Sequence, residues 1–423
     1  MGPFVNELDY FIKHIDSMKK TLPLVMSLGD IVIEGVEKKY DEFMNSEYVT
    51  ILEKDENRRR FTISPEKVKE YDRISSELES LSTAFNFMPK SIIVSLVSIY
   101  DAHVGNLIEN MFEVKPELLN SLNKDVSFTD VLKASSINDL KEDIIAKEIN
   151  IVLRKSHLEQ IEWFEKKLGI TLRSNKELIG KFVEITERRN LFVHSDGKVS
   201  NHYLNICKQN NYKFKKEPNV GDKLDVETNY FYDTVNCLLE IGIKLTHIIW
   251  RKLSPTQISL ADENYTSITY DLIESDNYEL AISLLEFILD SNQYDADYEL
   301  IYLINLSQSY KWSGHEDKCK ELIMSRNNWS LYKEKYQIAK HVLLGEYEEV
   351  YCLFRKYSDD DNVITKQWIR EWPLFKEIRD DEEFNSIFEE VYEEPLILNE
   401  RNQDKEIIER NIADKEVAAT DCI

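Results

Sequence analysis

The segment RRNLFVHSDG, residues 188–197, holds the side chains best suited to chemistry on an anion. Arg189 carries a permanent positive charge on a planar group that binds phosphate or carboxylate through paired hydrogen bonds. His194 exchanges a proton near neutral pH, so it can act as a general acid or base. Asn190 lies four residues before His194, and side chains with this spacing share one face of a helix. These residue types and their spacing predict a catalytic site for an anionic substrate.

A predicted helix over 176–193 positions these side chains. Leu178, Phe182 and Ile185 follow the i, i+4, i+7 spacing of a buried helix face. The same stripe continues to Arg189, so we expect its guanidinium to face a packing partner. Because a partly buried cation needs a counter-charge, we also expect an anion beside it.

Sequence signals mark both ends of this helix. Ser174 followed by Glu177 predicts a capping box at its start, and the Ser-Asp-Gly sequence at 195–197 predicts its end. His194 would then lie in the last turn, where the helix dipole favours the imidazolium form. The alternative interpretation is that His194 only complements the dipole and has no catalytic role.

Basic residues cluster around and after the motif. From 187 to 216 the chain has seven Lys/Arg against two Asp/Glu, a net charge of +5, whereas the whole protein carries −25. Lys198, Lys208 and Lys213 are therefore candidate substrate-binding residues, since cations near a site attract phosphate. A solvated helix face that happens to be basic would have the same composition.

A strongly apolar helix predicted over 91–112 carries two further polar side chains, Asp101 and His103. We expect a solvated helix face for both, and we retain Asp101 as an additional candidate for substrate binding. The apolar stretches at 91–100 and 237–250 are short, so they indicate buried core helices and not membrane spans.

The composition predicts an all-α fold. Gly and Pro number only 11 and 9 in 423 residues, which favours helices over turn-rich sheets. Five widely spaced cysteines, with no C-x-x-C pair, indicate neither a disulfide framework nor a zinc site and suit a reducing cytoplasm. The N-terminus does not have the pattern of a signal peptide. Besides the motif helix and 91–112, helices are predicted over 137–154, 156–168 and 228–253.

The N-terminal segment, residues 1–65, is expected to combine helix and hairpin. Residues 4–45 have an amphipathic helical pattern that Pro23 and Gly29 should break. Two β-rich runs at 48–52 and 59–63 surround a polar stretch and predict a small hairpin.

Residues 256–395 have a repeating helical pattern. Pairs of amphipathic helices recur with a period near 34, and their predicted turns fall at Asp276, Gly314 and Gly345. This pattern resembles tetratricopeptide repeats, which stack into a solenoid, and the resemblance implies that they bind a protein partner or sense a trigger. Trp368 and Trp372 are expected in the solenoid core. From 377 to 423 the chain has 16 Asp/Glu against five Lys/Arg, so residues 396–423 are expected to form a flexible acidic tail.

The hexapeptide from Arg189 to His194 resembles the R-x4-6-H motif of the HEPN superfamily, helical domains many of which are ribonucleases. The resemblance covers 66–255 and includes the polar residue after the Arg and the long apolar helix upstream. It implies a homodimer in which both motifs face one groove. It also implies RNA cleavage by attack of the 2′-OH, without a metal or cofactor, leaving a 2′,3′-cyclic phosphate. His194 would move the proton, Arg189 would stabilise charge on the phosphate, and Asn190 would orient His194 or hold the phosphate.

The leading hypothesis is therefore a cytoplasmic, metal-independent endoribonuclease that cuts tRNA or other cellular RNA in a bacterial toxin or phage-defence system. The alternative is a non-catalytic helical adaptor, in which the bundle dimerises and the repeats bind a protein. The sequence contains no phosphate-binding P-loop, dinucleotide fingerprint, G-x-S-x-G or H-E-x-x-H motif.

Overall fold

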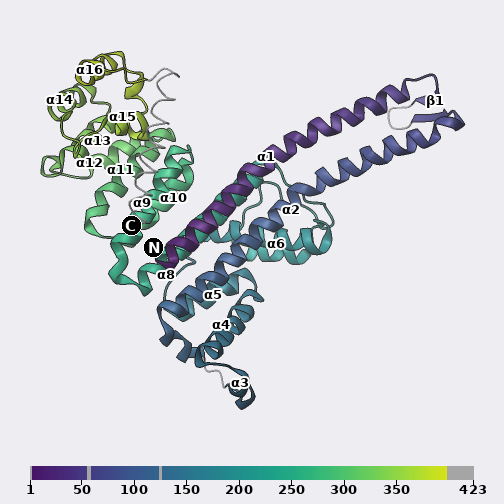
Figure 1. The fold of residues 1–423 in the computed structure, drawn as a ribbon, viewed down its shortest axis with the longest axis horizontal. Helices are drawn as coiled ribbons and strands as arrows, with labels where there is room; N and C mark the ends of the chain where they lie inside the picture. The colour runs from purple at the N-terminus through teal and green to yellow at the C-terminus, as the bar shows by residue number, and fades with distance from the viewer. Residues whose placement is uncertain (1, 55–58, 123–125, 398–423) are drawn as a thin grey trace. The chain divides into compact units, whose positions relative to one another are not determined.

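The computed structural model describes residues 2–54, 59–122 and 126–397, which fold almost entirely into α-helices (Figure 1). The expected all-α class is therefore confirmed, with one two-stranded sheet in these ranges. The chain divides into two compact units, residues 1–256 and 257–423. The acidic tail predicted for 396–423 lies, from residue 398 onward, outside the described residues.

The first unit contains a long helical pair, the sheet and several shorter helices. The helices predicted over 137–154, 156–168 and 228–253 are confirmed to within one residue at each end. The elements are α1 (Pro3–Met44), β1 (Val49–Lys54), β2 (Arg59–Ile63), α2 (Val68–Val114), α3 (Phe128–Lys133), α4 (Ile137–Leu153), α5 (His157–Leu168), α6 (Lys176–Ser195), α7 (Asn201–Gln209) and α8 (Thr228–Leu253).

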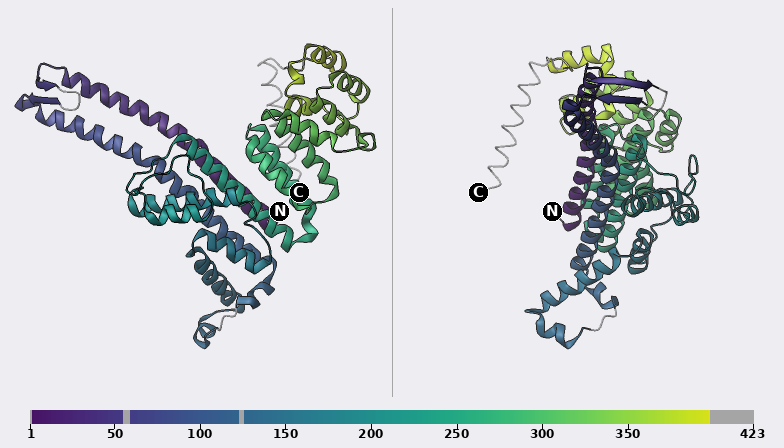
Figure 2. Two further views of the ribbon diagram at one scale, coloured as in Figure 1. Left: turned by 180° about the vertical axis from the view of Figure 1, so that it is seen from behind. Right: turned by 90° about the vertical axis from the view of Figure 1, so that its right-hand side faces the viewer.

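Helices α1 and α2 run side by side as a long arm (Figures 1 and 2). The predicted breaks at Pro23 and Gly29 are wrong, because α1 continues through both positions. An added Cβ at Gly29 would lie 2.2 Å from the Phe85 ring, so the missing side chain lets α2 approach closely. Pro and Gly cost about 3 and 1 kcal/mol within a helix. Burial of two or three side chains such as Phe11 and Ile15 contributes about as much, roughly 1.5–3 kcal/mol each.

The predicted hairpin is also present, at the far end of this arm (Figure 1). Strand β1 pairs antiparallel with β2, placing Val49 opposite Ile63, and the register shifts between Ile51 and Glu53. The residues that connect the strands, 55–58, lie outside the described ranges.

The centre of the first unit lies where α1, α2 and α8 meet. The Phe11 ring stacks on His103 with centroids 4.2 Å apart. An added Cβ at Gly242 of α8 would lie 2.3 Å from the Phe11 ring, so this glycine admits the aromatic pair. His103 is 1% exposed, and its Nδ1 lies 2.9 Å from Glu7 Oε1. The expected solvated position is therefore wrong for His103. Helices α4 and α6 also pack against α2.

The second unit is built from successive helix pairs. The predicted turn positions Asp276, Gly314 and Gly345 all have positive φ angles, of 57°, 83° and 72°. Its helices are α9 (Ile258–Glu274), α10 (Tyr278–Ser291), α11 (Ala296–Trp312), α12 (Glu316–Met324), α13 (Glu334–Leu344), α14 (Tyr347–Tyr357), α15 (Lys366–Glu371) and α16 (Glu382–Tyr392).

The placement of Trp368 and Trp372 differs from the expectation. Both indoles are only half-buried and line a cavity of the second unit, so the prediction that they lie in the solenoid core is wrong. Trp372 is followed by Pro373, which ends α15 and leaves the ring at the cavity wall instead of inside a helix pair.

One helix among the described residues, Pro65–Val114, is long and apolar enough to meet a length-and-composition test for membrane spans. Half of its most apolar window is buried inside the protein. Core helices of soluble proteins pass the same test, so this finding is weak evidence for a membrane span.

Candidate active site at the end of helix α6

Helix α6 begins and ends through local side-chain and backbone contacts. The cap at its start is Asn175, whose Oδ1 accepts a hydrogen bond from Leu178 N at 3.0 Å. The predicted capping box at Ser174 is therefore wrong by one position. At the other end Asp196 and Gly197 adopt positive φ angles of 50° and 78°. An added Cβ at Gly197 would lie 3.0 Å from Leu224 O, so the chain needs glycine there.

The anion expected beside Arg189 is present, and it is the carboxylate of Asp101. Its Nη2 lies 3.0 Å from Asp101 Oδ2 on α2, and both side chains are about one-quarter exposed, at 23% and 24%. The expected solvated helix face is therefore wrong for Asp101. Arg189 Nε is buried and has no hydrogen-bond partner among the described residues. The guanidinium is thus anchored on one side and keeps an unused donor.

Asp101 has a second partner, His157, which the sequence did not identify. His157 Nε2 lies 3.0 Å from Asp101 Oδ1, so the two carboxylate oxygens serve different residues. The imidazole packs edge-on against Phe182 of α6. Ser156 caps α5 one residue before His157, so the start of the helix fixes the direction of the His157 side chain. Nothing in the sequence around residue 157 indicates a contact with residue 101.

Asn190 contacts Arg189 and not His194. Its Oδ1 accepts from Arg189 Nη1 at 3.2 Å, and its Nδ2 donates to Glu187 Oε1 at 3.4 Å. Asn190 therefore helps to orient the guanidinium. In the described part of the chain it makes no hydrogen bond to His194.

His194 lies in the last turn of α6 and is exposed. Within the described residues, the His194 side chain makes no hydrogen bond. The imidazole is exposed and lies five residues beyond the anchored guanidinium on the same helix, so it is accessible to a large substrate.

Arg188, although adjacent, belongs to a buried network. Its Nε donates to Glu184 Oε1 at 2.7 Å, and its guanidinium lies 3.8 Å from the centre of the Tyr230 ring. The Tyr203 and Tyr230 hydroxyls also donate to Glu184, at 2.6 and 3.0 Å. Burial raises the pKa of both phenols, so they remain donors at neutral pH. Arg188 therefore stabilises the packing of α6 against α7 and α8.

The structure separates the three candidate lysines. The Lys213 charge is one of those that lower the pKa of Glu177, near the start of α6. Residue 177 is about 25 Å along the helix from His194. Lys208 pairs with Glu217 at 2.6 Å. Lys198 lies near Asp196, just beyond His194. Thus only Lys198 is near the end of the helix.

Two further lysines, missed from the sequence, are also close to this end. Lys223 Nζ lies 2.6 Å from Asp196 Oδ2, and Lys90 Nζ lies 3.5 Å from Asp225 Oδ1. The hydrogen bond from Lys223, together with the charges of Lys90 and Lys198, lowers the pKa of Asp196. The region beside the last turn of α6 therefore contains three cations drawn from separate parts of the sequence, of which Lys90 is buried.

Within the described ranges, no group of three or more His, Cys, Asp or Glu side chains is arranged to hold a metal ion. Comparisons of this chain with protein-family models, curated proteins and solved structures gave no match.

Proposed function

We propose that this protein is an endoribonuclease of the HEPN type, with its active site at the end of α6. The observation that carries the proposal is the arrangement of the motif. Arg189 is anchored by Asp101 and Asn190, and His194 is exposed at the same helix end. Lys90, Lys198 and Lys223 supply positive charge nearby. Such a site suits a polyanionic substrate, and RNA provides its own nucleophile.

In the proposed reaction the RNA 2′-OH attacks the adjacent phosphorus. The new O2′–P bond forms as the P–O5′ bond breaks, giving a 2′,3′-cyclic phosphate and a 5′-OH. His194 takes the proton from the 2′-OH or gives one to the leaving 5′-oxygen. Arg189 stabilises the negative charge that accumulates on the phosphate oxygens. Neither step requires a metal ion or a cofactor.

A homodimer would supply two copies of His194, one as base and one as acid. An exposed apolar stripe on α1 supports self-association. Leu24, Leu28 and Ile31 are spaced by four and three residues and are 61%, 54% and 65% exposed. Such a stripe matches the seam of a helical pair.

Charges flanking this stripe favour an antiparallel partner. Lys19 and Lys20 precede the stripe, whereas Glu34 and Glu37 follow it. In an antiparallel pair related by two-fold symmetry, the lysines of one copy would lie opposite the carboxylates of the other. We therefore propose that a second copy of this chain covers the stripe.

RNA cleavage by the purified full-length protein in EDTA tests the proposal. A synthetic RNA and a DNA of the same sequence are incubated with wild type, His194→Ala and Arg189→Ala. We expect cleavage of the RNA alone, cyclic-phosphate ends, and loss of cleavage in both variants. Equal cleavage by all three proteins would exclude this site as the catalytic centre.

The second candidate function is a non-catalytic adaptor. The pairing of Arg189 with Asp101 favours it, because a guanidinium already neutralised by a carboxylate also serves a structural role. The exposed His194 favours the nuclease, since the described structure gives this side chain no packing role.

In either case we propose that the helix pairs of the second unit are tetratricopeptide-like and bind a partner or trigger. A cytoplasmic toxin or phage-defence protein would need such control.

A further inference from the structure

The second unit contains a cavity of about 460 Å³, in the size range of ligand sites. Its lining comes from α9, α11, α13 and α15, the first helices of successive pairs. Thr266, Ile301, Tyr336 and Glu371 line it at a constant interval of 35 residues. The cavity therefore lies on one face of the repeats, to which each helix pair contributes its first helix.

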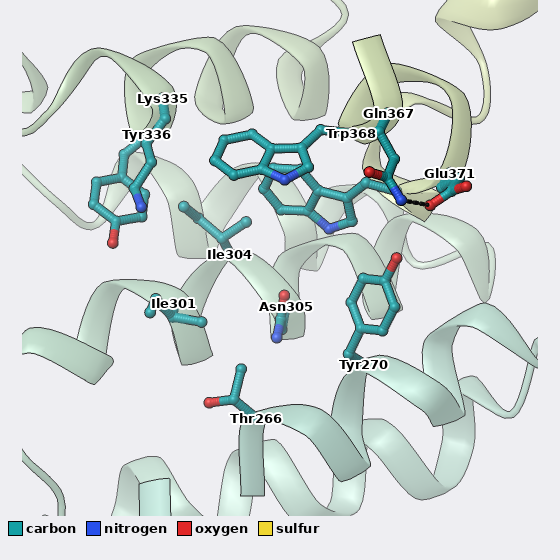
Figure 3. A pocket seen from close by; sticks show the side chains of 11 residues that line it. Thr266, Tyr270, Ile301, Ile304, Asn305, Lys335, Tyr336, Gln367, Trp368 and Glu371 are labelled. Carbon is teal, nitrogen blue, oxygen red and sulfur yellow. Dashed lines mark hydrogen bonds between the residues drawn. The ribbon is translucent and has the colours of Figure 1, made fainter. Parts of the chain in front are cut away.

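Four aromatic side chains form its walls: Tyr270, Tyr336, Trp368 and Trp372 (Figure 3). The two indoles meet nearly edge to face, with centroids 6.4 Å apart. Lys335 lies over the Trp368 ring, 5.9 Å from its centre, so a cation already occupies that face. The remaining aromatic surface suits an uncharged apolar group.

The wall that carries the tryptophans is held in place. Thr365 caps α15 by accepting a hydrogen bond from Trp368 N at 3.1 Å. Arg379 donates to the carbonyl oxygens of Ile369 and Trp372. These contacts fix both ends of α15, so the cavity is formed before any ligand binds.

Two polar groups in the lining lack partners. Asn305 is 3% exposed; its Oδ1 accepts from Gln308 Nε2 at 3.0 Å, and its Nδ2 makes no hydrogen bond within the described residues. Thr266 Oγ1 is also buried without a described partner. Figure 3 shows Asn305 between Ile301 and Tyr270, across the cavity from the Trp368 indole. A carboxamide and a hydroxyl can together serve both the N–H and the C=O of a peptide group.

The surrounding charge is strongly negative. Residues 257–397 contain 31 Asp/Glu against 13 Lys/Arg, a net charge of −18, whereas residues 1–256 contain 40 against 36. Close to the cavity, burial and then the charges of Glu274 and Glu371 raise the pKa of Tyr270. Burial and then the charge of Asp297 raise the pKa of Tyr336. This field repels phosphate-bearing ligands and attracts cationic ones.

We propose that this cavity binds a basic peptide segment of a partner protein, which inserts a bulky apolar side chain among Tyr270, Tyr336 and the two indoles. Asn305 and Thr266 then hydrogen-bond the peptide backbone, and lysines or arginines flanking the inserted side chain lie against the acidic rim. This inference rests on the part of the proposed function that gives the second unit a partner. The chain's own segment 398–423 is a poorer occupant, because it carries seven Asp/Glu against four Lys/Arg.

Selection from a display library of random 12-residue peptides, with the full-length protein as bait, tests the proposal. We expect the enriched peptides to be net positive and to share one aromatic or large aliphatic residue. Their binding, measured by fluorescence anisotropy, should weaken at least about thirtyfold with Trp368→Ala. The exposed rim variant Glu371→Lys should also weaken it, whereas Glu348→Lys on α14 makes the same charge change away from the cavity and should have no effect.

Several results would overturn the proposal: enrichment of acidic peptides, no enrichment at all, or equal binding to wild type and Trp368→Ala. Binding of a single-stranded RNA at the cavity would do so too, as would peptide binding that requires removal of residues 398–423. RNA cleavage is measured on the same preparations. Normal cleavage without peptide binding refutes this inference alone, and peptide binding without cleavage refutes the nuclease alone.

Discussion

Arg189 and Asp101 lie 88 residues apart in the sequence and form an ion pair with 3.0 Å between Nη2 and Oδ2. The other oxygen of Asp101 contacts His157. The Asp101 carboxylate therefore links α2, α5 and α6 beside Arg189, the first residue of the motif. It orients the guanidinium, and in the proposed reaction it would also compete with the RNA phosphate for the same donors.

These two effects predict a split between kinetic constants for Asp101→Asn. The variant keeps the side-chain shape but cannot serve both partners as a charged acceptor, so Arg189 is held less firmly. We expect kcat for RNA cleavage to fall roughly tenfold. KM should stay the same or decrease, because one negative charge is removed beside the phosphate. Glu109→Gln, an exposed change on the same helix, is the control. A higher KM with unchanged kcat would contradict the positioning role.

Replacing His194 tests the proton transfer directly. We expect His194→Ala to lower the rate of RNA cleavage by about 10²- to 10⁴-fold, the usual contribution of a general acid or base. His202 is also exposed and lies nearby in sequence on α7, so His202→Ala is a matched control that should retain activity. Both variants should keep the wild-type melting temperature. The catalytic assignment fails if the two substitutions have equal effects on cleavage.

The adjacent arginines should give opposite results. Arg188→Ala leaves Glu184, whose side chain is 1% exposed, without its cation, and breaking a buried pair costs about 3–5 kcal/mol. We expect a lower urea midpoint for this variant. Arg189→Ala removes a partly exposed cation, so we expect a much smaller stability change and a loss of cleavage of about 10²-fold or more. Urea unfolding and cleavage assays on both proteins measure the difference. If Arg188→Ala leaves the urea midpoint unchanged, the buried network does not stabilise the fold.

Features set by neighbouring residues could be predicted from the sequence. The turns at Asp276, Gly314 and Gly345 were found because left-handed backbone favours Gly and Asp. The end of α6 at Gly197 was found for the same reason. The start of α6 was misplaced by one residue, since Ser174 and Asn175 are both good caps and only packing decides between them.

Features that depend on distant contacts could not be predicted. Gly29 was expected to break α1, but the Phe85 ring fills the space that it leaves. His157 joined the site through Asp101, and no local pattern connects residues on α5 and α2. Trp368 was expected in the solenoid core but lines a cavity. Whether such a ring fills a core or lines a cavity depends on three other helices of the unit.

The apolar stripe on α1 predicts how the oligomer responds to substitution. Leu28 lies at the centre of the stripe and is 54% exposed in the single chain, so Leu28→Lys should not disturb the fold of one protomer. In an antiparallel pair it would bury a charge at the seam, which we expect to raise the dimer dissociation constant by at least about tenfold. Light scattering after size exclusion measures the mass as a function of concentration.

The matched control for this variant is Phe128→Lys on α3. It introduces the same charge at a side chain that is 76% exposed in the same unit, away from α1. This variant should keep the wild-type mass. RNA cleavage by Leu28→Lys should fall at low protein concentration and recover as the concentration rises, because the dimer supplies the second His194. A Leu28→Lys protein that remains dimeric would place the interface elsewhere, whereas a monomer with full activity would show that one protomer is sufficient for cleavage.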